Sequence, residues 1–292
     1  MTALRLVAAC LALSLPALCQ YFKITREQIV EMTKDNPFGR SDDGRPKVPD
    51  ALLEKVRGLT VEEVWTVLPG QKYGRQYAGG FQVLHPGTKL VGRAVTVTFV
   101  PARPDLHELV MSDLKNRGIT WAAHQHIIDQ LQPGDVMVVD LFGKAEGGTV
   151  VGDNLATAIK SATVNGGLVV DGGIRDLEGI HPIGMPVYYR HAHPSAIADV
   201  TLLSHNGPTR IGEATVLPGD VVFGDRTGLY FIPPAFVQRI VDRAEETHLH
   251  DEWTKAKFLS GRYKSSDLYP TPRDPKLKAE YEEFKKQRKA RQ

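Results

Sequence analysis

Cysteine is nearly absent from this sequence. Its 292 residues include two cysteines, Cys10 and Cys19, and both lie within the first 19 residues. If that segment is removed, the remaining chain has no cysteine, which excludes disulfides, thiol nucleophiles and cysteine-ligated metal sites. We then expect the fold to depend on its hydrophobic core alone.

The sequence also lacks a large charge of either sign. Its formal net charge is +2, with 36 Lys and Arg against 34 Asp and Glu. We expect no nucleic-acid partner, because this balance gives no strongly basic surface. Internal repeats and low-complexity runs are missing as well. The chain is long enough for one large domain or two small ones.

One long apolar stretch is present, at the start of the chain. The first residues read MTALRLVAACLALSLPALCQ, with Arg5 before an apolar run that Pro16 ends. Ala17, Leu18 and Cys19 then form a small-x-small pattern, which is typical of a signal-peptide cleavage site. The stretch is too short for a good transmembrane span. We predict a signal peptide over 1–19 and an exported, periplasmic protein with no stable membrane insertion; an uncleaved anchor or a buried helix are the alternatives.

Four regions follow from the patterning. Residues 20–50 are polar and rich in turn residues, which predicts an N-terminal arm. Residues 51–265 carry the periodic segments and are expected to form one folded domain, and residues 266–292 form a charged tail typical of a solvated helix. Helices are predicted over 50–68, 105–118, 120–134, 154–167 and 233–261, and strands over 90–100, 134–142, 167–173, 185–190 and three times within 213–233.

The densest pattern lies between residues 134 and 173. GDVMVVDLF and GLVVDGG are continuous apolar runs, typical of strands that are buried on both faces. The helical segment NLATAIKSATVNGG separates them. A strand, a helix and a strand in this order predict a right-handed crossover between parallel strands.

A possible anion site opens the helix of this unit. The stretch GGTVVGDNLATA places glycines before the helix, so the backbone N–H groups of Asn154 and Leu155 face outward at its positive end. A small anion would bind there. The alternative is that Asp153 merely caps the helix.

The second strand of the unit ends in VVDGGIRD, residues 169–176. Asp171 ends the buried run, and Arg175 and Asp176 emerge after the glycine turn, at the edge where α/β sheets collect ligands. Arg175 can bind a carboxylate or enolate oxygen with its planar guanidinium, and Asp176 is a hard oxygen ligand for Mg²⁺ or Mn²⁺. The alternative is a local surface ion pair.

The stretch GDVMVVDLFGKAEGGTVVGDNLATAIKSATVNGGLVVDGGIRDLEGI resembles the RraA-like family, which includes the 4-hydroxy-4-methyl-2-oxoglutarate aldolases. GTKLVGRAVTVTF and ATVLPGDVVFGDRTGLYFIPPAFVQRIVDRAEE extend the resemblance over residues 50–265. It implies an α/β fold of the swivelling β/β/α type, with mixed sheets, crossover helices and a long C-terminal helix. It also implies a homotrimer or hexamer, and a divalent-metal lyase that cleaves a 4-hydroxy-2-oxo acid, or decarboxylates oxaloacetate, to release pyruvate.

Residue roles follow from the same resemblance. The substrate carboxylate would bind to the backbone of four consecutive residues, Gly152, Asp153, Asn154 and Leu155. Arg175 would hold the keto or enolate oxygen, and Asp176 would hold the Mg²⁺ or Mn²⁺ ion.

Proton transfer would involve water oriented by Asp153, or by Glu252 from the last helix of a neighbouring subunit.

Two other functions stay open. The sequence has three His-x-His pairs, at 124 and 126, 191 and 193, and 248 and 250. The first and last lie in helical patterns, where such side chains diverge, but the middle pair follows a strand and is a candidate zinc site of a metallohydrolase. The second alternative is a non-catalytic RraA-like binding protein, since some members inhibit a ribonuclease. Aspartate at position 176 favours a catalytic protein over a non-catalytic binding protein.

Overall fold

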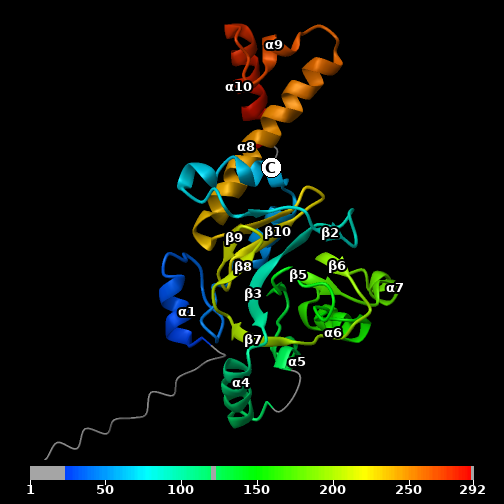
Figure 1. Ribbon diagram of the computed structural model, residues 1–292. Coiled ribbons are helices and arrows are strands. Elements are labelled where there is room, and N and C mark those ends of the chain that lie inside the picture. The colour runs from blue at the N-terminus through cyan, green and yellow to red at the C-terminus, as the bar shows by residue number, and fades with distance from the viewer. Residues whose placement is uncertain (1–23, 120–122, 291–292) are drawn as a thin grey trace, which may run out of the picture.

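The computed structural model describes residues 24–119 and 123–290 of the chain (Figure 1). The signal peptide predicted over 1–19 lies outside the described residues. Within these two ranges, no helix is long and apolar enough to cross a membrane.

A mixed sheet of nine strands forms the centre of the molecule. The strand order is β1-β11-β10-β3-β4-β5-β6-β2, and β7 pairs with β3 off this path. Strands β3 to β6 are parallel, and the other strands join antiparallel. A small second sheet pairs β8 with β9. The strands are β1 (Tyr77–Ala78), β2 (Gln82–Val83), β3 (Leu90–Pro101), β4 (Asp135–Asp140), β5 (Gly167–Ile174), β6 (Val187–Ala192), β7 (Val200–His205), β8 (Thr209–Ile211), β9 (Ala214–Val216), β10 (Val221–Gly224) and β11 (Leu229–Ile232).

Helices cover this sheet in two groups. One group, α4 to α7, packs on β3 to β6 around a cluster that includes Met137, Ile159 and Val170. The other group, α2, α3 and the start of α8, packs on β10 and β11. The helices are α1 (Arg26–Met32), α2 (Asp50–Arg57), α3 (Val61–Trp65), α4 (Pro104–Asn116), α5 (Ala123–Ile128), α6 (Asp153–Thr163), α7 (Leu177–Ile180), α8 (Pro234–Leu259), α9 (Ser265–Leu268) and α10 (Pro275–Lys289), with 3₁₀ turns η1 (Pro69–Gln71) and η2 (His181–Ile183).

The central crossover agrees with the prediction. Every residue of β4 and β5 is buried, and α6 connects these two parallel neighbours. Parallel strands covered on both faces need apolar residues at successive positions, which is the pattern of these two segments. The predicted α/β class, with a mixed sheet, a crossover helix and a long C-terminal helix, is confirmed.

The helix predicted over 50–68 is wrong as a single element. Two short helices, α2 and α3, replace it, and the break falls at Gly58 and Leu59. Thr60 starts the second helix because its side chain accepts the Glu63 N–H while the Glu63 carboxylate accepts the Thr60 N–H. Such a capping box stabilises a new helix start and turns both helices onto the core.

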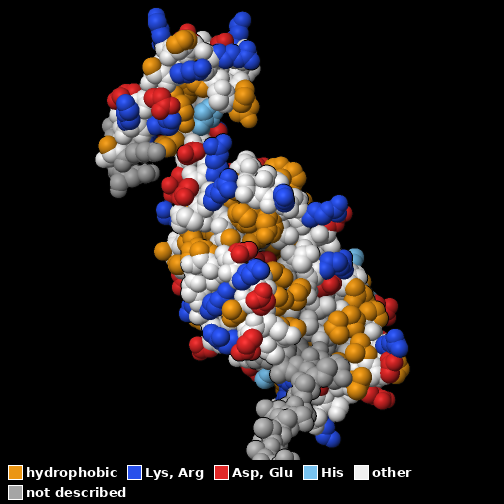
Figure 2. Space-filling view, turned by 90° about the vertical axis from the view of Figure 1, so that its left-hand side faces the viewer, with side chains coloured by type: hydrophobic (Ala, Val, Ile, Leu, Met, Phe, Trp, Pro, Cys, Tyr) orange, Lys and Arg blue, Asp and Glu red, His pale blue; other side chains and the backbone are white. Residues whose placement is uncertain are grey.

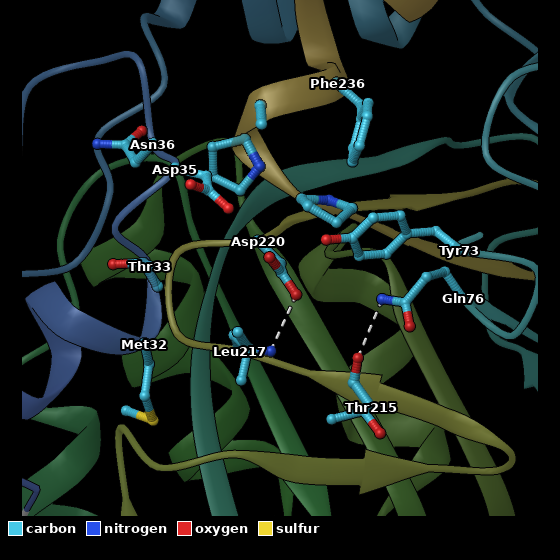
Figure 3. A pocket seen from close by; sticks show the side chains of 13 residues that line it. Met32, Thr33, Asp35, Asn36, Tyr73, Gln76, Thr215, Leu217, Asp220 and Phe236 are labelled. Atoms are coloured by element: carbon cyan, nitrogen blue, oxygen red, sulfur yellow. Dashed lines mark hydrogen bonds between the residues drawn. The ribbon is translucent and has the colours of Figure 1, made fainter. Parts of the chain in front are cut away.

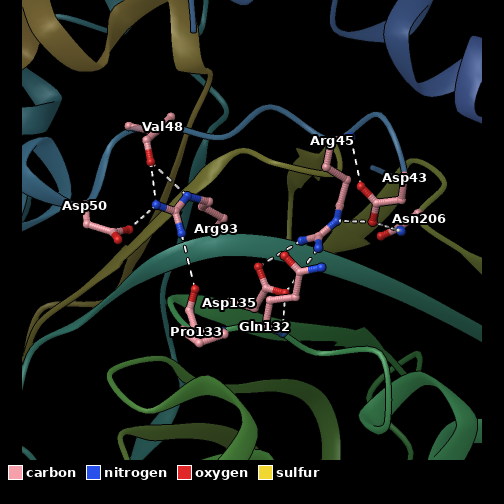
Figure 4. A network of polar contacts seen from close by, with 9 residues as sticks. All are labelled: Asp43, Arg45, Val48, Asp50, Arg93, Gln132, Pro133, Asp135 and Asn206. Carbon is pink, nitrogen blue, oxygen red and sulfur yellow. Dashed lines mark hydrogen bonds and ion pairs between the residues drawn. The ribbon is translucent and has the colours of Figure 1, made fainter. Parts of the chain in front are cut away.

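The segment before residue 50 packs against the domain through buried charge (Figure 4). Arg45 makes a bidentate pair with Asp135 at the start of β4, with N–O distances of 2.9 and 3.1 Å. Its Nε also donates to Asp43, 2.6 Å away. Nearby, Arg93 of β3 donates to the Val48 carbonyl. These contacts hold residues 43–48 on the domain.

The C-terminal helices project from the body (Figure 1). The first half of α8 is buried against α2 and α3, and its second half extends outward to carry α9 and α10. Figure 2 shows this projection standing apart, with many Lys and Arg side chains, while hydrophobic side chains gather on the body below it. The tail predicted over 266–292 thus contains a helix, α10, that packs on the outer half of α8.

Candidate active site

The loop after β4 folds back beside the end of β5. The Gly173 N–H donates to the Gly148 carbonyl at 3.0 Å, and the Arg175 N–H donates to the Val151 carbonyl at 3.2 Å. These bonds extend the parallel pairing by one short segment. They place Gly152, the residue before α6, next to the residues that follow β5.

Gly152 makes this close approach possible. A Cβ atom at this position would lie 2.3 Å from Asp176 Oδ2 and 3.0 Å from Arg175 Nε. No larger residue fits without moving one of these two side chains. The absence of a side chain at Gly152 thus lets the start of α6 lie in contact with the Arg175–Asp176 pair in its present arrangement.

The N-terminus of α6 opens toward the same place. Gly152 is its N-cap and provides no side-chain hydrogen bond, and Asp153 is the first helical residue. The Asp153 carboxylate accepts the N–H of Asn154 at 2.8 Å, so it does not act from the usual N-cap position. The positive end of an 11-residue helix thus meets the residues after β5.

Arg175 and Asp176 form the ion pair that the alternative interpretation predicted. Arg175 Nε lies 3.3 Å from Asp176 Oδ2, and the two side chains are 40% and 45% exposed. An exposed pair of this kind contributes only about 0–1 kcal/mol to stability. Asp176 also has a left-handed backbone, with φ 59° and ψ 42°, which an aspartate adopts at some cost. Both charged groups remain accessible to a ligand.

A cavity of about 150 Å³ joins these parts. Five of the predicted site residues line it: Gly152, Asp153, Asn154, Leu155 and Arg175. Asp176 stands beside it through its contacts with Gly152 and Arg175. The structure therefore brings the helix start and the glycine turn to one edge, as the order of the crossover unit predicted.

His124 of α5 lines the same cavity, together with Gln125 and Thr149. Burial lowers the pKa of His124 below its usual value, so its imidazole is neutral at about pH 7. From the sequence, His124 and His126 were expected to diverge on a helix and not to form a site. Its spacing to His126 carried no signal for the site, because the relevant neighbours come from α6 and the loop before it.

Glu252 lies elsewhere in the chain. It sits on the outer half of α8 and pairs with Arg288 of α10. In Figure 1 this part of α8 projects on the side of the body away from α6. Within one subunit Glu252 does not line the cavity, and its contribution from a neighbouring subunit stays a prediction.

In the middle histidine pair, His193 makes a contact within the protein and His191 is exposed. His191 lies in β6 with an exposed side chain, and His193 Nδ1 lies 2.9 Å from the Ser195 hydroxyl. The same hydroxyl accepts the Gly147 N–H at 2.7 Å, so His193 supports the loop around the cavity. Across residues 24–119 and 123–290, no three His, Cys, Asp or Glu side chains are grouped to hold a metal. A closed zinc site therefore has no support in that part of the chain.

The residues at this edge fit a different kind of metal. Mg²⁺ and Mn²⁺ need few protein ligands, because they keep several waters and share oxygens with the substrate. The Asp176 carboxylate is hard, half exposed and adjacent to the cavity. Asp153 packs on α7: a Cβ atom added to Gly179 of that helix would lie 2.8 Å from the Cβ of Asp153. The Asp153 carboxylate in the lining and the Asp176 carboxylate beside the cavity match that requirement.

Comparison with known proteins identifies the family. The model of the RraA-like family, described as Aldolase/RraA, matches residues 49–230, which is more than half of the chain. The chain belongs to the RraA-like family. The matched range contains the loop before α6, Arg175 and Asp176.

Relatives of known sequence are distant. The chain is 28% identical over 188 residues to Protein DlpA of Legionella pneumophila, covering 63% of this chain and 28% of that protein. It is 28% identical over 123 residues to a Halalkalibacterium halodurans protein named "Putative 4-hydroxy-4-methyl-2-oxoglutarate aldolase", covering 42% of this chain and 58% of the relative. The chain thus spans less than two thirds of the length of these two relatives.

Solved structures share the fold. RraAS2 of Streptomyces coelicolor, described as an unusual member of the RNase ES inhibitor RraA protein family, has a TM-score of 0.62 at 27% identity. The match covers 72% of this chain and all of that one. An uncharacterized protein from Pseudomonas syringae gives the same TM-score at 23% identity, covering 78% of this chain and 94% of its own, which shows the fold alone.

Proposed function

We propose that this protein is a divalent-metal-dependent carbon–carbon lyase that releases pyruvate from a 4-hydroxy-2-oxo acid or from oxaloacetate. One observation carries the proposal: the open N-terminus of α6 and Arg175 line one small cavity, with Asp176 at its edge. A 2-oxo acid has an anionic carboxylate next to a keto oxygen. The cavity offers a separate partner for each.

Substrate binding would use the backbone and Arg175. The Leu155 N–H in the first turn of α6 suits the carboxylate because the positive helix end favours an anion. The Asn154 N–H would join it by giving up its bond to the Asp153 carboxylate. The Arg175 guanidinium then donates to the keto oxygen, and its planar shape fixes the orientation of the substrate. Arg175 exchanges its exposed ion pair with Asp176 for this contact, at little cost in stability.

Asp176 would hold the metal ion, with water and substrate oxygens as the other ligands. When bound, a Mg²⁺ or Mn²⁺ ion supplies Lewis-acid stabilisation of the negative charge that develops on the keto oxygen. Arg175 acts on the same charge from the protein side, in a site that is held ready before the reaction starts.

Proton transfer has two candidates in the same chain. In aldol cleavage the C4 hydroxyl loses its proton, the C3–C4 bond breaks, and C3 of the resulting enolate takes up a proton. In decarboxylation carbon dioxide leaves and water supplies the proton at C3. Neutral His124 and the carboxylate of Asp153 both line the cavity and would orient that water. Glu252 of a neighbouring subunit remains part of the proposal.

The proposal also covers assembly and location. A neighbouring subunit is needed if Glu252 is to reach a cavity, since it lies on the projecting half of α8. The resemblance to the family favours a trimer or hexamer. Export to the periplasm rests on the pattern of residues 1–19.

The test is a coupled pyruvate assay over a panel of 4-hydroxy-2-oxo acids and oxaloacetate, with Mg²⁺, with Mn²⁺ and with neither. We expect pyruvate release from at least one substrate, and only when metal is present. Preference within the panel distinguishes aldol cleavage from decarboxylation. Zinc-dependent hydrolysis of esters or amides, without pyruvate release, would instead support a metallohydrolase.

A second candidate is a non-catalytic binding protein. The similarity to RraAS2 favours it, because the match covers the whole RraAS2 chain and RraAS2 is described as a member of a ribonuclease-inhibitor family. Such a role requires neither metal nor substrate. If no member of the panel yields pyruvate, and the protein instead lowers the activity of a ribonuclease of that class, this function replaces the lyase.

A further inference from the structure

A second cavity, of about 230 Å³, lies away from the candidate active site (Figure 3). Segments far apart in the sequence form it: the end of α1, the chain before β1, the turn between β9 and β10, and the start of α8. It shares no lining residue with the first cavity. The lyase proposal gives it no role.

The lining of this cavity combines apolar groups with acid. Met32, Leu217, two prolines and the rings of Tyr73 and Phe236 supply the apolar surface. The two rings meet edge to face, with centroids 4.9 Å apart. Asp35 and Asp220 are the charged residues of the lining, and no Lys, Arg or His belongs to it. The cavity therefore carries negative charge beside aromatic surface.

Asp220 is placed for an interaction with a ligand. Its residue is 3% exposed, and its Oδ2 accepts the N–H of Leu217 at 2.9 Å. In Figure 3 the other carboxylate oxygen points away from Leu217, toward the space below Asp35 and Tyr73. A buried carboxylate with an oxygen turned into a cavity is costly unless a donor or a positive charge meets it.

We propose that this cavity binds a small organic cation, an ammonium group on an apolar body. The ammonium would donate to the buried oxygen of Asp220, with Asp35 adding attraction at the rim. The apolar body would lie against Tyr73 and Phe236, whose ring faces also attract a cation. This site is independent of the proposed lyase activity and of the residues that carry it.

Anions and neutral molecules fit less well. A phosphate or carboxylate would meet two acids and no basic side chain within the lining. A neutral molecule of the same shape would gain the apolar contacts but would leave the charge of Asp220 unbalanced. The chemistry of the lining thus ranks three ligands of equal size: cation first, neutral second, anion last.

The test compares three probes of one shape by isothermal titration: benzylamine, benzyl alcohol and benzoate. A pH of about 8 keeps the amine protonated and ionises Asp220, whose pKa burial raises to about 7. We expect benzylamine to bind with a dissociation constant of about 1 mM, as suits so small a ligand. Benzyl alcohol should bind at least about tenfold more weakly, and benzoate should not bind.

Variants locate the binding. Asp220→Asn keeps an oxygen that accepts the Leu217 N–H but removes the charge, so it should lose the preference for benzylamine over benzyl alcohol. Asp35→Asn, at the exposed rim, should weaken the binding of benzylamine by only a few-fold. The matched control is Asp105→Asn, an exposed acid on α4 outside the lining, which should leave all three affinities unchanged.

Several results would overturn the proposal. These are equal binding of the three probes, tighter binding of benzoate, no saturable benzylamine binding up to about 10 mM, or an unchanged preference in Asp220→Asn. If Asp220→Asn fails to fold, the three probes on the wild-type protein decide alone. Pyruvate release by Asp220→Asn should match wild type, because Asp220 does not line the first cavity; failure of the lyase proposal would leave the probe results unaffected.

Discussion

Replacing Asp176 by asparagine separates catalysis from structure. The left-handed backbone of Asp176, φ 59° and ψ 42°, is one that asparagine adopts readily, so Asp176→Asn adds no backbone strain. The side chain is 45% exposed, and its ion pair with Arg175 is worth about 0–1 kcal/mol. We therefore expect the free energy of unfolding to change by no more than about 1 kcal/mol.

The effect on turnover should be much larger. Asparagine keeps one oxygen but loses the negative charge that the metal ion requires. Losing one electrostatic contact of this kind typically costs about 3–4 kcal/mol, or a factor of about 10²–10³ in rate. Turnover is measured by pyruvate release at saturating Mg²⁺, and stability by urea denaturation of the same preparations.

Asp199→Asn is the matched control. Asp199 is also an exposed aspartate with a left-handed backbone, φ 55°, but the ion pair of Arg175 is with Asp176 and not with Asp199. Its replacement should change neither turnover nor stability. Near wild-type turnover in Asp176→Asn would refute the assignment of Asp176 to the metal. A stability loss well above about 1 kcal/mol would show instead that Asp176 has a structural role.

The remaining predictions concern four other features. Arg175→Lys should lower turnover about 10²-fold, because a point charge cannot replace the planar guanidinium; unchanged turnover would exclude Arg175 from the site. His124→Asn should lower the rate about 10²-fold and flatten its pH profile, whereas His126→Asn should not. Burial raises the pKa of Asp220 to about 7 in the folded protein, so the free energy of unfolding should be highest below about pH 4 and should fall as the pH rises through about 7. Urea unfolding of Asp220→Asn should lack this decline. Light scattering should show a trimer or hexamer, and a monomer at micromolar concentration would remove Glu252 from the site.

The crossover unit could be predicted from sequence because its signals are local and agree. Continuous apolar runs specify β4 and β5, and glycines mark both ends of the connection. Strand order then places Arg175 and the start of α6 at one edge, since the carboxyl ends of adjacent parallel strands meet there. The contact between them, through Gly152, follows from that geometry.

Other features depend on contacts that no local pattern encodes. His124 enters the cavity because α5 packs beside α6, a tertiary contact without a spacing signal. Arg45 is buried by its pairing with Asp135, ninety residues away, although its own segment is polar and rich in turns. The break between α2 and α3 had a local signal in the Thr60–Glu63 capping box, which the helical periodicity of the surrounding residues obscured.

The most direct measurement is pyruvate release by the wild-type protein before and after metal removal, with its preferred 2-oxo acid as substrate. We expect excess EDTA to abolish the activity, and added Mg²⁺ or Mn²⁺ to restore it while the fold, followed by circular dichroism, stays unchanged. Undiminished pyruvate release in excess chelator would contradict the metal role of Asp176. No pyruvate release from any substrate, with metal supplied, would contradict the lyase itself.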